Sequence, residues 1–295
     1  MRLTYCQIRV SSYRELDKDY VKQFADMGFG VLGFPIDLNA TDDDCTRIVD
    51  LFGELGIAVG QVTAGKACCM LHPTPAVERE YEQTIMRALE IGGKIGATAL
   101  QFSVGTLNPD NVWGIHPDND TQRSLDLLVA RARRFTPVAE DTGCMISPET
   151  TQWTIVNTIE RMKEYVERLD SPYMKIVFDP VNHMTPERLL DSGPHMRRAI
   201  AYLGDCIGAL HVKDAVPTAN TNLVCHIDEA KMGTGWLDHA ALIEASAFLE
   251  PWKNFILEHI RDAALIKPAH DHIAGIASRI GHVWTDPLCT RERWE

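Results

Sequence analysis

The sequence predicts an α/β protein in which strand and helix alternate eight times, the pattern of a (β/α)₈ barrel, and three observations support this fold class. Eight short apolar runs rich in β-branched residues recur along the 295 residues. Each run is followed by a segment with helical periodicity. Glycine stands just before several runs, where a left-handed helix cap would place it. Eight such units in about 280 residues are typical of a closed (β/α)₈ barrel.

The eight runs are expected to be parallel strands. Their near-continuous content of Val, Ile and Leu suits strands that are covered on both faces. Four runs lie in each half of the chain, so the units are evenly spaced. The runs are LTYCQIRV from Leu3, FGVLGFP from Phe29, IAVGQV from Ile57, TALQFSVG from Thr98, CMISPE from Cys144, MKIVFD from Met174, IGALHVKD from Ile207 and NFILEHI from Asn254.

The segments between the runs are expected to be crossover helices. Residues 17–29, 41–57 and 185–205 place apolar residues at helical spacing, with Asp, Thr or Pro near the start. Four glycines that precede runs are expected in the left-handed conformation that ends a helix. They are Gly28, Gly56, Gly96 and Gly143.

A doubly wound open sheet is the alternative architecture. It is disfavoured because no early run ends in the G-x-G-x-x-G turn that holds a dinucleotide, and no G-x-x-x-x-G-K-[ST] motif occurs. The chain contains no low-complexity segment or linker. Residues 1–295 are therefore expected to form a single barrel domain with extended βα loops.

Composition and charge limit the class of partner. Hydrophobic residues make up 45% of the chain and charged residues 24%, which provides ample material for a core. The formal net charge of −12 disfavours nucleic acid or an anionic membrane as the main partner, because both call for a basic surface. The start, MRLTYCQIRV, lacks a long apolar segment, so a cytoplasmic protein is expected. The eight cysteines form no C-x-x-C pair and are expected to be reduced.

Polar side chains end the last four predicted strands. Glu149, Asp179, His211 and Glu258 occupy these positions. Singly, each would more often be a capping group, an ion-pair partner or a core histidine. Together, they are expected at one end of a barrel, where a shared cation would offset the cost of several buried carboxylates. Three carboxylates and one imidazole form a hard ligand set, so Mn²⁺ is the expected ion, with Mg²⁺ and Co²⁺ as alternatives.

These residues also carry a resemblance to a known family. The order Glu, Asp, His, Glu on strands five to eight, with FDPVN at Asp179, HVKD at His211 and GTGWLD before the last strand, resembles the xylose-isomerase-like TIM-barrel superfamily of sugar phosphate isomerases and epimerases. Its relatives include ketose 3-epimerases, inosose dehydratase and C-glycoside deglycosidase subunits. The resemblance implies that the four residues bind a divalent metal and that Glu149 and Glu258 transfer protons.

The sequence departs from the ketose 3-epimerases at one position. Those proteins carry a histidine three residues after the aspartate of strand six, whereas this chain has Asn182 there and His183 next to it. Both residues are expected to contact the substrate. The H-x-K-D form that begins at His211 looks more like the inosose dehydratases. The resemblance therefore supports the fold and the metal site of this chain more strongly than it supports a particular substrate.

The expected activity is isomerisation or epimerisation of a ketose or another polyhydroxy carbonyl compound. A metal that binds the carbonyl and a neighbouring hydroxyl would acidify the adjacent C–H and stabilise an enediolate. One glutamate would remove the proton, and the other would return it to the same or the neighbouring carbon. Elimination from the same intermediate would instead make the protein a lyase, of the inosose dehydratase or C-glycoside deglycosidase type. A noncatalytic barrel subunit is a further alternative.

Other substrate contacts are expected from loops that follow the strands. Trp113 and His116 lie in a long loop after strand four, and His226 lies after strand seven. A tryptophan there could equally serve local packing. Lys213 could pair with Asp214 or approach a substrate oxygen. The expected partner is a small sugar, a polyol ketone or a glycoside, and the sequence leaves open whether the chain forms a homo-oligomer or joins a partner subunit.

Overall fold

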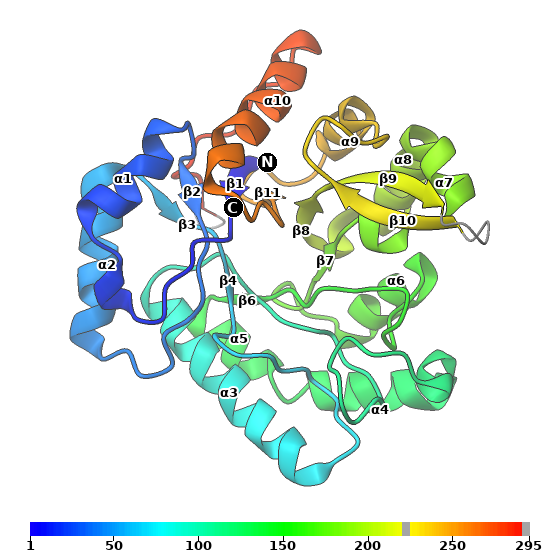
Figure 1. Ribbon diagram of the computed structural model, residues 1–295. Coiled ribbons are helices and arrows are strands. Elements are labelled where there is room, and N and C mark those ends of the chain that lie inside the picture. Colours follow the sequence, from blue (N-terminus) through cyan, green and yellow to red (C-terminus); the bar gives the residue numbers. More distant parts are fainter. Residues whose placement is uncertain (220–224, 291–295) are drawn as a thin grey trace.

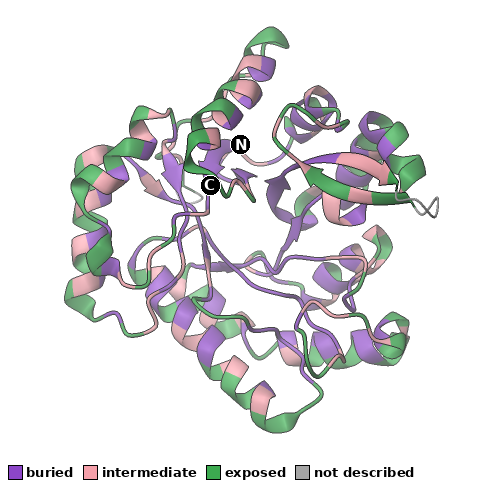
Figure 2. Cartoon of the chain, in the orientation of Figure 1, coloured by how far each residue is buried: buried purple, intermediate pink, exposed green. Residues whose placement is uncertain are grey.

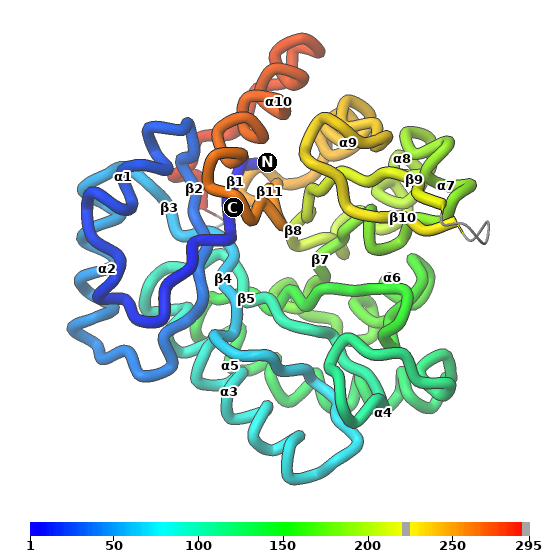
Figure 3. Tube along the Cα trace, in the orientation of Figure 1, coloured from blue at the N-terminus to red at the C-terminus, as the bar shows by residue number. Residues whose placement is uncertain are grey.

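A computed structural model describes residues 1–219 and 225–290 of the chain. In Figure 1 the strands occupy the centre and the helices surround them. The colours of the tube in Figure 3 follow the sequence in order around this centre, so successive units lie beside one another. Within the described residues, no helix is both long enough and apolar enough to cross a bilayer.

All eight predicted strands are present. The third is interrupted at Gly60 and forms two short segments, β3 and β4. A Cβ atom at Gly60 would lie 2.7 Å from Cγ1 of Val31, so the close approach of the neighbouring strand requires glycine there. The strands are β1 (Arg2–Tyr5), β2 (Val31–Leu32), β3 (Ala58–Val59), β4 (Gln61–Thr63), β5 (Ala99–Gln101), β6 (Met145–Ile146), β7 (Ile176–Phe178), β8 (Ile207–Val212) and β11 (Asn254–Leu257).

These strands pair in parallel in two sheets. One sheet has the order β3-β2-β1-β11-β8-β7, and the other has the order β4-β5-β6. The sheets meet at Gly60, which separates β3 from β4, and at isolated parallel bridges between Ile146 and Met174 and between Glu149 and Val177. Strand order around the centre therefore follows the sequence, and the predicted TIM-barrel class is confirmed.

Helices follow the strands as predicted. The region 185–205 holds two helices instead of one, because Pro194 has no N–H for the bond that a continuous helix would need there. The break lies at Asp191, which has φ −126° and ψ 45°. The helices are α1 (Lys18–Asp26), α2 (Asp42–Leu55), α3 (Pro75–Lys94), α4 (Gln122–Ala132), α5 (Thr136–Thr142), α6 (Ile159–Leu169), α7 (Pro186–Leu190), α8 (Ser192–Leu203), α9 (His239–Ser246) and α10 (Ile266–Arg279).

Local signals set the ends of these helices. Thr41 and Asp44 form a capping box at the start of α2, in which each side chain accepts a backbone N–H of the other residue. All four glycines predicted to be left-handed have positive φ, from 65° at Gly56 to 107° at Gly28. Five short 3₁₀ turns add further connections. They are η1 (Tyr13–Glu15), η2 (Pro117–Asp120), η3 (Val181–His183), η4 (Gly204–Cys206) and η5 (Ala263–Leu265).

The core lies between the strands and the inner faces of the helices, as the purple regions of Figure 2 show. Aromatic side chains such as Phe34, Tyr165, Phe178 and Phe255 are fully buried within it. All eight cysteines are free, and six of them are buried, as expected of reduced core residues.

One element was missed by the sequence analysis. The segment after β8 forms an antiparallel hairpin of β9 (Asp214–Ala219) and β10 (Cys225–Ala230) before α9. Most residues of β10 are exposed, so the hairpin lacks the apolar run by which the other strands were found. In Figure 1 this hairpin projects outward beside β8.

Candidate metal centre

The four polar residues at the strand ends converge. Glu149 follows β6, Asp179 follows β7, His211 lies in β8 and Glu258 follows β11. Each offers one ligand atom, and these atoms all lie within 4.8 Å of one another. The arrangement follows from the fold, because the carboxyl ends of parallel barrel strands meet at one mouth. Within the described part of the chain, this is the one group of His, Cys, Asp and Glu side chains with such a geometry.

The imidazole of His211 faces the carboxylates through one nitrogen. Its Nδ1 lies 2.9 Å from Oε2 of Glu258 and 3.6 Å from Oε1 of Glu149. Its Nε2 lies 2.7 Å from the side-chain amide of Gln61 in β4. The ring is thus held between the cluster and a second polar residue, as is usual for histidines that bind metals.

The atoms of the cluster suit a cation. Three of its buried atoms make no hydrogen bond: Oδ2 of Asp179, Nδ1 of His211 and Oε2 of Glu258. Their nearest neighbours are the charged groups of the same site: Nδ1 of His211 lies 2.9 Å from Oε2 of Glu258, and Nζ of Lys213 lies 2.8 Å from Oδ2 of Asp179. Buried charges that gather in this way are either paired or bound to a metal. Oxygen and imidazole ligands suit a hard divalent ion such as Mg²⁺ or Mn²⁺. The residues present therefore fit a divalent cation.

A lysine lies at the edge of the cluster. Nζ of Lys213 is 2.8 Å from Oδ2 of Asp179, 3.2 Å from Oε2 of Glu258 and 3.9 Å from Oε1 of Glu149. Burial alone would lower the pKa of Lys213, but Asp179 and the other carboxylates raise it well above its usual range, so the ammonium persists. Three carboxylates and one ammonium leave a net charge of −2 when His211 is neutral. A divalent cation would neutralise that charge.

The pKa shifts of the clustered residues also arise from burial and from the charges of neighbouring side chains. Burial would lower the pKa of His211, but the carboxylates of Glu258 and Glu149 raise it to about 10. Burial would raise the pKa of Glu258, but His211 and Lys213 hold it well below its usual range. Burial raises the pKa of Asp179, although Lys213 opposes this shift. The site therefore retains a positive charge on His211 in the metal-free protein, and a cation can take the place of that proton.

Two amides fix the carboxylate of Glu149. Nε2 of Gln101 donates to its Oε2 at 2.8 Å, and Nδ2 of Asn182 donates to its Oε1 at 2.6 Å. Asn182 was among the predicted substrate contacts, whereas Gln61 and Gln101 were not predicted. Both glutamines stand inside apolar strand runs, and this isolated polarity is the signal that could have identified them.

The predicted substrate contacts lie in several environments. Nε2 of His183 is 3.1 Å from Oγ1 of Thr150, and its ring stacks on Phe178 inside the core. His116 caps η2, because its Nδ1 accepts the backbone N–H of Asp118. His226 lies on the exposed strand β10. Of the predicted set, Lys213 and Asn182 contact the cluster directly.

Two cavities lie near the cluster, and one of them is lined by a residue of it. One, of about 290 Å³, is lined by Gln101, Phe102 and Trp113, so it reaches the residue that holds Glu149. The other, of about 280 Å³, is lined by Lys213 and Glu258 together with side chains of the hairpin and of the loop after β11. A small polyhydroxy molecule thus has room beside Lys213 and Glu258, and a second space lies next to Gln101.

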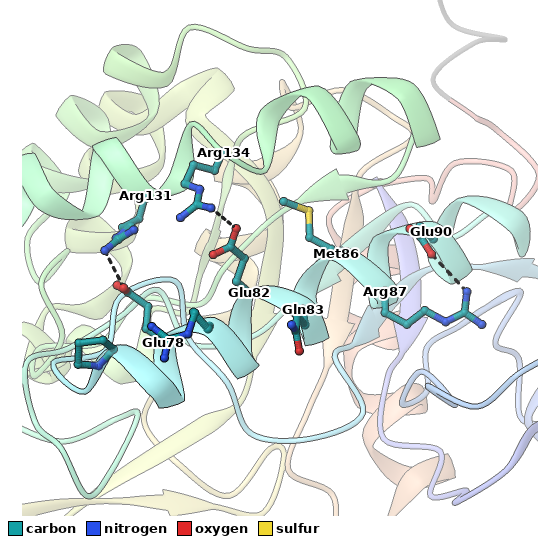
Figure 4. Close-up of a pocket in the computed structure, with 10 residues that line it drawn as sticks. Glu78, Glu82, Gln83, Met86, Arg87, Glu90, Arg131 and Arg134 are labelled. Carbon is teal, nitrogen blue, oxygen red and sulfur yellow. Dashed lines mark hydrogen bonds and ion pairs between the residues drawn. The ribbon is translucent and has the colours of Figure 1, made fainter.

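A larger cavity lies away from the cluster. It is a groove of about 700 Å³ on the outside of the barrel, between α3 and the end of α4 (Figure 4). Its charged side chains pair across the groove, Arg131 with Glu78 at 2.7 Å and Arg134 with Glu82 at 2.6 Å. These pairs join the two helices, and the groove contains none of the four clustered residues.

Comparison with known proteins agrees with this architecture. Residues 21–274 match the family model described as xylose isomerase-like TIM barrel. The fold is similar to that of 3-keto-D-glucoside 4-epimerase from E. coli, with a TM-score of 0.67 and 19% identity over 94% of this chain and 98% of that one. It is also similar to a D-psicose 3-epimerase, with a TM-score of 0.70 and 16% identity over 95% and 100% of the two chains.

A third similar structure contains a metal. It is a xylose isomerase-like TIM barrel protein from Mycobacterium smegmatis in complex with magnesium, with a TM-score of 0.66 and 14% identity over 89% and 88% of the two chains. No curated protein matches the chain by sequence. At these identities the likeness establishes the fold.

Proposed function

We propose that this chain, which belongs to the xylose isomerase-like TIM barrel family, is a divalent-metal-dependent isomerase or epimerase. Its substrate would be a ketose or another polyhydroxy carbonyl compound. One observation carries this proposal: three carboxylates and an imidazole from four strand ends converge, so that one ligand atom of each lies within 4.8 Å of the others. The similarity of the fold to two sugar epimerases supports the same class of substrate.

Glu149, Asp179, His211 and Glu258 would hold the cation. When bound, it would supply positive charge to the substrate oxygen on which negative charge develops. Mn²⁺ is the ion proposed, with Mg²⁺ and Co²⁺ as alternatives, because all three accept this hard ligand set.

The glutamates would move the proton. Glu149 or Glu258 takes the proton from the carbon next to the carbonyl; the electron pair of that C–H bond forms a C=C bond, and the π pair of the carbonyl moves to its oxygen. For epimerisation, the other glutamate gives a proton to the opposite face of the same carbon as the carbonyl re-forms. For isomerisation, it gives the proton to the former carbonyl carbon, the hydroxyl proton of the first carbon passes to the former carbonyl oxygen, and the first carbon becomes the carbonyl. Gln101 and Asn182 hold Glu149 in one orientation for this transfer.

Lys213 and the two cavities would place the substrate. The buried ammonium of Lys213 lies 3.2 Å from Oε2 of Glu258, close enough to bind a substrate oxygen beside the reacting carbons. The cavity that Trp113 lines would accept the more distant hydroxyl groups, since an aromatic face suits the C–H face of a sugar.

The test is proton exchange with solvent. Protein loaded with Mn²⁺ is incubated in D₂O with a panel of ketoses and keto-glycosides, and each recovered sugar is identified by NMR and mass spectrometry. Incorporation of one deuterium with formation of an epimer or an aldose–ketose isomer is expected. Loss of water or of an aglycone would assign a lyase. Failure to bind Mn²⁺, or binding without any exchange, would refute the proposal.

A further inference from the structure

The residue that follows Glu258 has an unusual backbone. His259 has φ 58°, and within the described residues only one other non-glycine residue, Asp170, has positive φ. Asp170 ends helix α6, where a left-handed residue is ordinary. His259 ends no helix, and the next helical turn begins at Ala263. Non-glycine residues at positive φ are uncommon and often lie at functional sites, where the surrounding structure holds them in place.

The side chain of His259 is hydrogen-bonded to one carboxylate and lies near a second. Its Nδ1 is 2.6 Å from Oε1 of Glu229 on β10, and its Nε2 is 3.8 Å from Oε1 of Glu258. The same oxygen of Glu229 lies 3.5 Å from Nζ of Lys213. The hairpin therefore reaches the cluster at Glu229, which contacts both Lys213 and His259. All four side chains line the cavity of about 280 Å³.

We infer that Glu229 and His259 form a positioning pair for Glu258. The inference rests on the proposed function, in which Glu258 both binds the cation and transfers a proton. Oε2 of Glu258 faces His211 and Lys213, so Oε1 is the oxygen whose direction His259 can set. Residues that orient a metal ligand without touching the metal commonly change its affinity by about 10- to 100-fold when removed. A pair that only docks the hairpin would have no such effect.

Titration with Mn²⁺ separates these two roles without any substrate. His259→Gly and Glu229→Ala are each expected to raise the Kd for Mn²⁺ about tenfold. Asp228→Ala is the matched control, because Asp228 lies on the same strand and bonds Thr218 instead of the cluster. It is expected to bind Mn²⁺ as the wild type does. Unchanged affinity in both Glu229→Ala and His259→Gly would overturn the inference.

Unfolding in the presence of a chelator tests the strain separately. Glycine adopts positive φ without steric cost, so His259→Gly is expected to keep or raise the urea midpoint of the metal-free protein. A lower midpoint together with weaker Mn²⁺ binding would assign His259 a structural role and overturn the inference. If the wild type bound no Mn²⁺, the proposed function would fail. The inference would fail with it, whereas a wild type that binds Mn²⁺ and two variants that match its affinity would overturn the inference alone.

Discussion

The side-chain amide of Gln61 lies 2.7 Å from Nε2 of His211, on the side of the imidazole away from the carboxylates. This contact connects β4 to β8 and keeps Nδ1 directed at the cluster. Oε1 of Gln61 is itself buried without a hydrogen bond. If the amide turned by 180°, its oxygen could accept a hydrogen bond from Nε2–H of His211. The lone pair of Nδ1 would then be available to a cation. Gln61 can thus select the tautomer that metal binding requires.

Replacement of Gln61 should therefore weaken metal binding. Gln61→Leu keeps a similar volume but removes the acceptor, and the Kd for Mn²⁺ is expected to rise about 10- to 100-fold in isothermal titration. Gln122→Leu is the matched control, because Gln122 lies on the exposed face of α4. Equal affinity in Gln61→Leu and the control would show that the amide does not orient His211.

Loss of the carboxylate at position 149 should stop proton transfer. Glu149→Gln keeps the shape of the side chain but removes the base, so deuterium exchange is expected to fall at least about 100-fold while circular dichroism stays unchanged. Glu164→Gln on α6 provides a control at an exposed ion pair. Exchange at the wild-type rate in Glu149→Gln would remove this residue from the mechanism.

The buried ammonium of Lys213 should stabilise the metal-free protein. Lys213→Met removes the ammonium beside Asp179 and one of the two positive groups beside Oε2 of Glu258, and breaking a buried pair in this way costs about 3 to 5 kcal/mol. Saturating Mn²⁺ is expected to restore a large part of the loss, because it supplies charge to the same carboxylates. Urea unfolding with chelator and with Mn²⁺ measures both values. A loss that is equal in the two conditions would contradict this account.

His183 should make stability depend on pH. Burial lowers its pKa from 6.5 to about 4 in the folded protein. Between these values the unfolded chain takes up a proton that the folded chain does not, so stability falls as pH falls. From pH 7.5 to 5.5 this loss is about 1 kcal/mol. His183→Gln should reduce the pH-dependent loss by that amount in urea unfolding at the two pH values. The same pH dependence of stability in the wild type and in His183→Gln would refute this role of His183.

Much of the barrel could be predicted from sequence because its strands are buried on both faces and therefore appear as unbroken apolar runs. The four clustered residues followed from the same pattern, since each lies at or near the end of such a run. The hairpin did not follow, because strands such as β10 that face solvent carry no apolar period. Glu229 and its contact with His259 were missed for that reason.

The neighbours Asn182 and His183 show a second limit. They lie in the 3₁₀ turn η3, where successive side chains diverge by about 120°. Asn182 reaches Glu149 and His183 reaches Thr150. Both were expected to contact substrate, and the turn directs them to different surroundings. The direction depends on backbone angles that residue types alone do not determine.

The division of the strands into two sheets assigns the ligands unequally. Glu149 follows the last strand of the three-stranded sheet, whereas the other three ligands belong to strands of the six-stranded sheet. Between β6 and β7 the sheets are connected by isolated bridges, one of which joins Glu149 to Val177. A cation shared by all four residues would cross-link the two sheets at this junction. The backbone amides along that junction would then exchange with solvent more slowly in the metal-loaded protein, so the proposed ion would stabilise the barrel as well as serve the proposed reaction.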